Sequence, residues 1–258
     1  MNRRSAIFGA TLLLPGCSVG AAPAEIRYQL RAKFLVGART IEGVTTFRCR
    51  YWAPSTHPFA GKGGSIGVAW SEALYVDLAE RGMLVGLIGT VPGIIPPEGR
   101  EYWPGCFRPL DPALEIGYRN LSELTTDALG DRRVEVEMAR AMRGEQALPP
   151  THWPVFIHFS DPNEIRTASW VHIPRQRLGA TSVTASKTLG EVCGDVASLL
   201  ALTVEVTNSP VAEQILTTLP WLTEIQGSPR NPRSGFSRNR DSALHEKLAY
   251  GNFKLTGR

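Results

Sequence analysis

Two histidines are the residues of this chain whose types and spacing are best suited to chemistry. His158 and His172 lie in two successive apolar runs, Val155–Phe159 and Trp170–Ile173, separated by a proline-containing turn. If the runs pair antiparallel so that His158 faces His172, their Cβ atoms lie about 4.5–5.5 Å apart. Two imidazoles that close could share a metal ion or a proton. The competing interpretation, two half-buried rings that are hydrogen-bonded locally, is favoured because no carboxylate or third ligand accompanies them.

Two other sets of residues could bind a ligand, and each has a simpler structural explanation. Asp161-Pro162-Asn163 offers oxygen ligands for calcium, but a turn with Asp at its first position and proline next also accounts for it. A sugar-stacking platform of tryptophans is less common than aromatic anchors of a β core. The tryptophans concerned are Trp103, Trp153, Trp170 and Trp221. No nucleophile elbow, zinc-protease, dinucleotide or EF-hand motif occurs, so neither a metal nor another cofactor is expected.

The first residues have the pattern of an export signal. Arg3-Arg4 precedes the nine-residue apolar run Ala6–Leu14, which is too short for a permanent membrane-spanning helix. The following Leu14-Pro15-Gly16-Cys17 resembles the lipobox of bacterial lipoproteins. That resemblance implies cleavage before Cys17 and lipid attachment there, and Ser18 in the next position implies transport to the outer membrane. The alternative is cleavage after Ala22-Pro23-Ala24, which would release a soluble periplasmic protein.

The cysteines fit an exported protein. With Cys17 lipidated, three thiols remain, and an oxidising compartment favours one bridge among them. Cys106 and Cys193 are the candidate disulfide pair, whereas Cys49 is predicted to be buried on the apolar side of a strand. None of the cysteines has the spacing of a metal site.

Composition and charge place the chain among folded globular domains. It has 258 residues, 43% hydrophobic and 20% charged, which argues against disordered, collagen-like, disulfide-scaffold and multi-span membrane classes. Residues 227–258 carry seven basic and two acidic residues, a net charge of 7 − 2 = +5 that exceeds the +4 of the whole chain, so the basic character comes from this segment. No nucleic-acid recognition fold accompanies the charge, and nucleic acid is therefore not an expected partner.

Alternation of polar and apolar residues predicts most of the elements. In the first strand Tyr28, Leu30, Ala32 and Phe34 face inward, and a second strand pairs with it antiparallel. The predicted strands cover residues 27–33, 45–51, 73–78, 83–89, 155–160, 170–173 and 200–206. In the last of them Leu200, Leu202, Val204 and Val206 share the inner face. Residues 111–143 fit a helix and a strand equally well.

A short helix is predicted after the last of these strands. Ser209 is a suitable N-cap, Pro210 suits the first helical position, and Pro220 ends the helix.

Several later segments resemble a family of small uncharacterised bacterial proteins. The segments are Pro154–Asn163, Val171–Pro174, Val204–Val211, Leu219–Leu222 and Leu248–Lys254, together about a third of the chain. The resemblance implies architecture and no particular reaction. It also implies that the closing segment packs against the body of the protein.

These observations predict an α+β or mainly β fold, an antiparallel sheet or sandwich with one or two short helices. Residues 1–17 form the signal peptide and lipidation site, 25–226 one globular domain, and 227–258 a basic linker and C-terminal segment. The expected role is a non-catalytic envelope protein, held to the membrane by lipid on Cys17, that binds a protein, a polymer or a small ligand. The alternative is an envelope hydrolase that uses His158 and His172.

Overall fold

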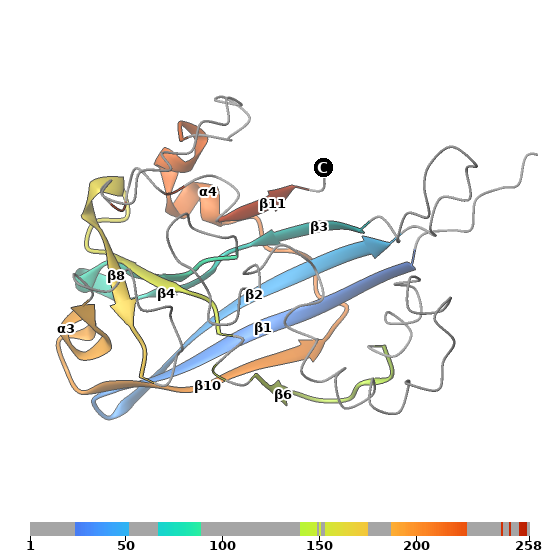
Figure 1. Cartoon of the computed structure of the whole chain (residues 1–258), viewed down its shortest axis with the longest axis horizontal. Helices are drawn as coiled ribbons and strands as arrows, with labels where there is room; N and C mark the ends of the chain where they lie inside the picture. The colour runs from blue at the N-terminus through green and yellow to red at the C-terminus, as the bar shows by residue number, and fades with distance from the viewer. Residues whose placement is uncertain are drawn as a thin grey trace, which may run out of the picture.

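The chain forms two β-sheets with short helical segments. The structure is a computed structural model that describes residues 24–51, 67–88, 140–148, 150, 153–174, 187–225, 244, 248 and 253–256. Sheet A has the strand order β11-β3-β2-β1-β10-β6, and sheet B has the order β4-β5-β7-β8-β9 (Figure 1). Within the described part of the chain, all neighbouring strands pair antiparallel except β8 with β9. The predicted strand-rich sandwich class is confirmed.

The elements have the following bounds. The strands are β1 (Ala24–Val36), β2 (Arg39–Tyr51), β3 (Gly67–Glu72), β4 (Leu74–Asp77), β5 (Met83–Gly86), β6 (Gln146–Ala147), β7 (Phe156–Phe159), β8 (Ala168–His172), β9 (Lys187–Thr188), β10 (Ala197–Val206) and β11 (Lys254–Thr256). The helices are α3 (Leu189–Cys193) and α4 (Ile215–Thr218), with 3-10 turns η1 (Ala79–Arg81), η4 (Ile165–Thr167) and η5 (Pro220–Thr223).

The long β1–β2 hairpin organises sheet A. Its tight turn includes Gly37, whose φ of +57° suits glycine, and Tyr28 lies opposite Phe47 in the resulting register. The rings of Tyr28 and Phe47 stack with centroids 4.8 Å apart. The predicted inward residues of β1 are all buried, because alternate side chains of a strand point to the same face.

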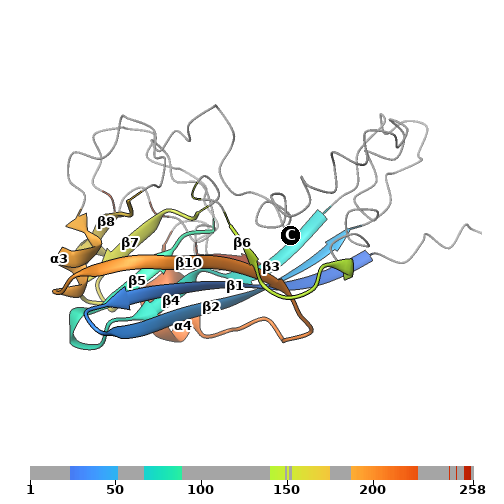
Figure 2. The ribbon, with the colours of Figure 1, turned by 90° about the horizontal axis from the view of Figure 1, so that it is seen from below.

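The inner faces of the two sheets form one core. The ring of Phe34 from sheet A meets Phe156 from sheet B edge to face, with centroids 5.7 Å apart. Leu74, Val76 and Val171 of sheet B belong to the same buried cluster. β4 of sheet B lies next to β1 and β2 of sheet A (Figure 2). Cys49 is buried in this core, as predicted.

A second apolar cluster covers the other face of sheet B. Phe159 on β7 contacts Trp221 on η5, and both rings lie near Phe253, which precedes β11. β11 pairs with β3, so the described residues near the C-terminus are part of the fold. The pairing agrees with the expectation that the closing segment packs against the body of the protein.

Two sequence-based details are wrong. The helix predicted from Ser209 begins only at Ile215, since the buried carboxylate of Glu72 accepts the backbone N–H groups of Gln214 and Ile215 at 2.8 and 2.9 Å. Leu200, predicted to face inward, is exposed. The register of β10 against β1 shifts between Lys33 and Phe34, and this bulge turns Leu200 outward.

Candidate anion-binding site

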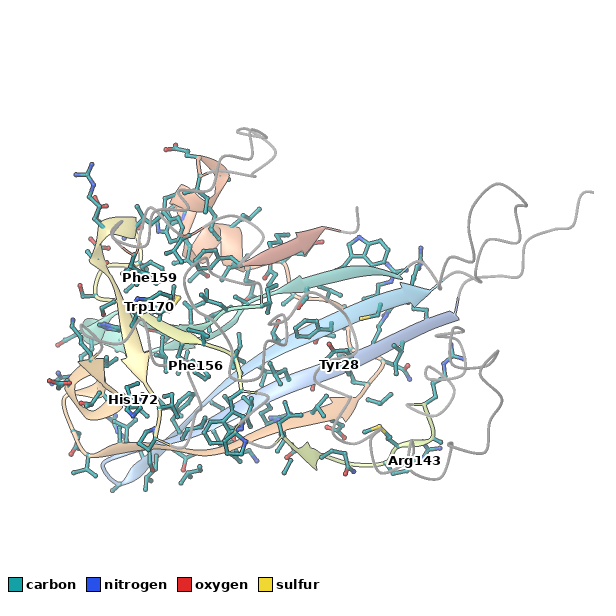
Figure 3. The ribbon with its side chains drawn as sticks, viewed as in Figure 1. Tyr28, Arg143, Phe156, Phe159, Trp170 and His172 are labelled. Carbon is teal, nitrogen blue, oxygen red and sulfur yellow. The ribbon has the colours of Figure 1, made fainter. Side chains whose placement is uncertain are left out.

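The predicted histidine pair is not formed. In the β7–β8 hairpin His158 lies opposite Ser169, and His172 is three positions further along β8. An odd shift in register moves a side chain to the other face of the sheet, so the two rings point away from each other. His158 is 4% exposed, whereas His172 is exposed beside Trp170 on β8 (Figure 3). The turn η4 helps to set this register, which alternation alone does not reveal.

His158 instead has a local hydrogen bond. Its Nε2 lies 2.7 Å from the carbonyl oxygen of Arg81, which can only accept, so Nε2 carries the proton. The other ring nitrogen, Nδ1, is buried without a hydrogen-bond partner in the described part of the chain. Burial lowers the pKa of His158, and the ring is therefore neutral at neutral pH. The interpretation of His158 as a buried, locally bonded ring is confirmed.

The predicted cysteine sites fall largely outside the described residues. Cys17 and Cys106 are not among them, so the lipidation site and the Cys106–Cys193 bridge stay predictions without structural support. Cys193 itself is a buried free thiol at the end of α3. Burial raises the pKa of this thiol, which keeps it protonated and weakly reactive.

The turn at Asp161 and two of the four tryptophans, Trp153 and Trp221, have structural roles. The side chain of Asp161 accepts the backbone N–H of Asn163 at 2.9 Å, as in an Asx turn. Within the described ranges no group of three or more His, Cys, Asp and Glu side chains could hold a metal ion. Trp153 and Trp221 are buried and donate their indole N–H groups to backbone carbonyls, which confirms them as core anchors. Trp103 lies outside the described residues.

Sequence reasoning missed a cluster of arginines around Glu25 on the outer face of sheet A. Glu25 lies opposite Arg50 in the β1–β2 register, and Arg27 lies opposite Arg48. The carboxylate of Glu25 accepts hydrogen bonds from Arg50 at 2.6 Å, Arg48 at 2.9 Å and Arg27 at 3.1 Å. Three guanidinium groups thus surround a single carboxylate, and we call these four residues the arginine site.

The electrostatics of the arginine site are fixed over the physiological pH range. The hydrogen bond from Arg48 contributes most to lowering the pKa of Glu25, which falls to about 2 despite an opposing effect of burial. Arginine side chains keep their charge in proteins. The site therefore holds three positive charges and one negative charge throughout this range.

Trp70 on β3 holds two of the guanidinium groups in place. It lies opposite Arg48 in the β2–β3 register. The guanidinium carbons of Arg48 and Arg50 are 5.2 and 5.5 Å from the centre of the indole ring, within the range of cation–π contacts. The Nε atom of Arg48 is buried and has no hydrogen-bond partner within the described ranges. The Arg48 side chain as a whole is 28% exposed.

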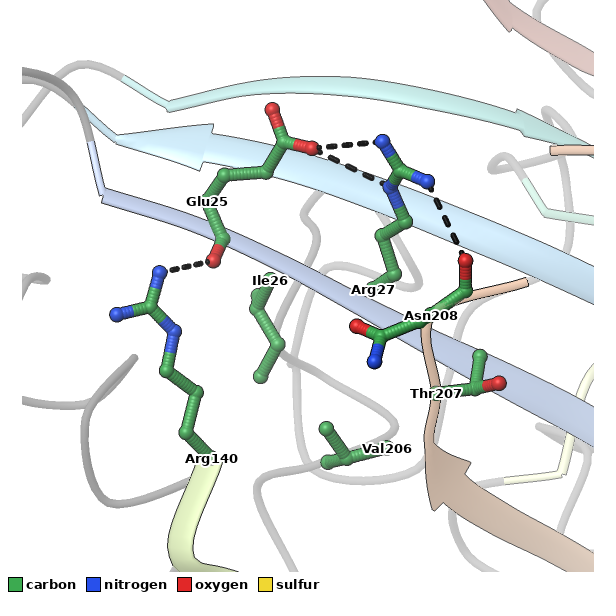
Figure 4. A pocket seen from close by; sticks show the side chains of 7 residues that line it. All are labelled: Glu25, Ile26, Arg27, Arg140, Val206, Thr207 and Asn208. Carbon is green, nitrogen blue, oxygen red and sulfur yellow. Dashed lines mark hydrogen bonds and ion pairs between the residues drawn. The ribbon is translucent and has the colours of Figure 1, made fainter. Parts of the chain in front are cut away.

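A pocket of about 350 Å³ opens beside Glu25 (Figure 4). Arg140 forms one wall and donates from Nη2 to the Glu25 carbonyl at 2.7 Å. Arg27 forms another wall, where its Nη1 lies 3.4 Å from the Asn208 carbonyl. Apolar side chains of Ile26 and Val206 also line the pocket. Guanidinium groups with an apolar lining suit a small anionic group attached to a less polar body.

Comparisons with known proteins assign no family. No family model matches the sequence, and neither a curated protein nor a solved structure matches it. Among the described residues no helix is long and apolar enough to cross a membrane.

Proposed function

We propose that this protein is an exported, lipid-anchored envelope protein that acts as a non-catalytic binding module and binds a carboxylate or phosphate group at the arginine site. The observation that carries the proposal is the convergence of Arg27, Arg48 and Arg50 on one carboxylate next to a pocket that Arg140 also lines. Arginine is suited to such ligands because its planar fork matches carboxylate and phosphate geometry.

Of the two ion-paired clusters among the described residues on this face of sheet A, only the one at Glu25 has an excess of positive charge. Further along the same face, Arg31 and Lys33 are shared between Glu42 and Glu145 at distances of 3.1–4.0 Å. Two basic and two acidic groups balance there. At the arginine site three guanidinium groups share one carboxylate, so an incoming anion is attracted to this end of the face.

The chemistry of the site favours binding over acid–base catalysis. A general acid or base works best with a pKa close to the working pH. Arginine side chains keep their charge in proteins, and the pKa of Glu25 lies at about 2. These groups supply fixed charges and hydrogen-bond donors.

The position of β1 supports lipid anchoring over cleavage after Ala24. β1 begins at Ala24, whose backbone pairs with Tyr51, and Glu25 follows directly. Cleavage before Cys17 would leave β1 whole, whereas cleavage after Ala24 would remove its first residue. Mass spectrometry of the mature N-terminus, with Cys17→Ala as the control, tests this part of the proposal. A lipidated Cys17 supports the anchor, and a soluble chain that starts at Glu25 contradicts it.

Anion titration tests the binding site. We expect the protein to bind inorganic phosphate or acetate in calorimetry at low ionic strength. Arg140→Gln should weaken this binding about tenfold or more, because a hydrogen bond to a charged group contributes roughly 1.5–3 kcal/mol. Arg39→Gln removes the same charge from the opposite end of β2 and should leave the affinity unchanged. Equal weakening by both variants, or no binding of either anion, would contradict the proposal.

A further inference from the structure

We propose that the anion bound at the arginine site is the phosphate group of an acidic membrane phospholipid, so that this end of sheet A lies against the bilayer surface. This inference rests on the proposed function and names the ligand of the same site. Three features of the protein lead to it: the position of the site relative to Cys17, the distribution of charge, and the placement of Trp70.

The first feature is the short distance along the chain between the anchor and the site. Six residues separate Cys17 from Ala24, where β1 begins. Even fully extended, this segment and its two ends span only about 25 Å, at roughly 3.3–3.6 Å per residue. An acyl group on Cys17 would therefore keep Glu25 and Arg27 close to the lipid headgroups.

The strands bring the other arginines to the tethered end. The start of β1, the end of β2 and the start of β3 lie together at one end of sheet A (Figure 1). Arg48 and Arg50 are near the end of β2, so they reach the same place as Arg27. The β1–β2 turn, with Arg39 beside it, lies at the far end of the same strands. Tethering through Cys17 therefore presents the arginine site to the membrane and holds Arg39 away from it.

The second feature is the match in charge. Anionic lipids give a membrane a negative surface potential, which attracts each nearby Lys or Arg. Only the arginine site has unbalanced guanidinium groups among the charged clusters described on this face. The side chains of Arg27, Arg48 and Arg50 are each partly exposed, so their guanidinium groups can donate to a phosphate oxygen. An acidic phospholipid therefore fits the site better than a zwitterionic one.

The third feature is Trp70. Its ring is half-buried and lies against the guanidinium groups of Arg48 and Arg50. Tryptophan is enriched at the membrane–water interface, where an amphipathic ring sits at headgroup depth. The Trp70 ring lies next to Arg48 and Arg50 at the tethered end, which suits a position at headgroup depth.

Vesicle binding without the lipid anchor tests the inference. The full chain carrying Cys17→Ser is mixed with vesicles of phosphatidylcholine alone and with vesicles in which one third is phosphatidylglycerol. Binding is measured by co-sedimentation at low salt. The ratio of the two partition coefficients reports the preference for acidic lipid. Every variant shares the same leader, so its contribution cancels when variants are compared.

The inference predicts different effects for variants at the arginine site and for a control variant at the far end of β2. Arg48→Gln and Arg50→Gln should each lower the preference for phosphatidylglycerol about fivefold, as expected for one charge at the surface. Arg39→Gln should leave it within about twofold, since its charge lies far from the contact. Glu25→Gln removes the negative charge and should raise the preference by about the same factor of five. Circular dichroism of each variant confirms that the fold is retained.

The outcomes separate this inference from the proposed function. Loss of phosphatidylglycerol preference in the arginine variants, with Arg39→Gln unchanged, supports the inference. If all arginine variants, including Arg39→Gln, behave alike, the inference is wrong. If inorganic phosphate or acetate still binds in calorimetry in that case, the site takes a soluble anion and the proposed function stands. If no anion binds, both are wrong.

Discussion

At the scale of single residues, Glu25 shows how an acidic side chain can organise a basic site. Without it, Arg27, Arg48 and Arg50 would lie together with no counter-charge, which is unfavourable for like charges on neighbouring strands. With it, the guanidinium groups are held in fixed positions and still carry more charge than Glu25 neutralises. Binding sites gain affinity from such preorganisation because the ligand does not have to order the side chains.

The lowered pKa of Glu25 predicts a specific acid sensitivity. The folded protein holds the pKa at about 2, compared with 4.5 for an unperturbed carboxyl group. The folded state therefore binds fewer protons than the unfolded state between these values. Glu25 contributes stability above pH 4.5, and this contribution is lost as the pH falls toward 2.

Glu25→Gln should therefore reduce the difference in free energy of unfolding between about pH 6 and about pH 3. Urea denaturation at the two pH values measures this difference. The matched control is Glu213→Gln, at an exposed position away from the site, which should keep the wild-type difference. An unchanged difference in Glu25→Gln would show that the three guanidinium contacts do not stabilise the carboxylate.

The sequence predicted which face of a strand a residue points to, but it did not predict which residues of neighbouring strands contact each other. Alternation placed Tyr28, Leu30, Ala32 and Phe34 of the first strand inward, and all four are buried. The convergence of Arg27, Arg48 and Arg50 on Glu25 depends on which residues of β1 and β2 lie opposite each other, and the turn at Gly37 sets that pairing. For His158 and His172 the assumed register was wrong by an odd number of residues, so the two side chains lie on opposite faces of the sheet.

At the scale of elements, β10 shows how a bulge overrides an apolar pattern. Leu199 lies opposite Phe34 and Ala201 opposite Lys33, so Leu200 is an extra residue without a partner on β1. Leu200 is 54% exposed as a result, although its neighbour two positions on, Leu202, is 1% exposed. The sequence alone reads as one unbroken apolar alternation through this region.

Paired substitutions on β10 test the bulge. Leu200→Ser should change the free energy of unfolding by no more than about 0.5 kcal/mol, as is usual for exposed positions. Leu202→Ala should lower it by about 2–5 kcal/mol, because it leaves a cavity in the core. Urea denaturation of both variants gives the comparison. A large loss in Leu200→Ser would mean that Leu200 is buried and that the strand has no bulge.

The helix after β10 was predicted to start at Ser209 from local residue types, but a tertiary contact sets its actual start. Ser209 and Pro210 have the residue types of a helix start, yet Ser209 instead bonds to Thr207. The N-terminus of α4 is satisfied by Glu72, which is more than 140 residues away in sequence. A cap from a distant strand leaves no signal in the local sequence.

At the scale of the whole molecule, Glu72 connects three separate parts of the chain. It is 1% exposed on β3, accepts the N–H groups at the start of α4, and pairs with Lys254 of β11 at 3.1 Å. Lys254 belongs to the basic C-terminal segment, and its side chain is 16% exposed. One of the tail charges thus lies inside the fold as the partner of a buried carboxylate.

This connection predicts strong coupling between Glu72 and Lys254. Glu72→Gln should lower the free energy of unfolding, by up to about 3–5 kcal/mol, because the partly buried Lys254 charge is left without its partner. The double variant Glu72→Gln with Lys254→Met should be more stable than Glu72→Gln alone, since no unpaired charge is left. A urea double-mutant cycle measures the coupling. Strictly additive effects would show that the two side chains do not interact.

The sandwich class could be predicted from sequence because period-two alternation marks most of the strands. The packing of the closing segment was predicted from a resemblance and not from periodicity. The order of strands in each sheet was not predictable, because β1 pairs with β10 and β3 with β11 across most of the chain. Pairings of that sequence separation depend on the global fold.

The pairing of β11 with β3 also has a consequence for how the protein is made. The β1–β2 hairpin is local and can form early, but sheet A lacks its edge strand until residues 254–256 have left the ribosome. Loop-closure entropy further slows pairings between such distant segments. The edge of β3 therefore stays open until a strand that follows it by more than 180 residues has been made.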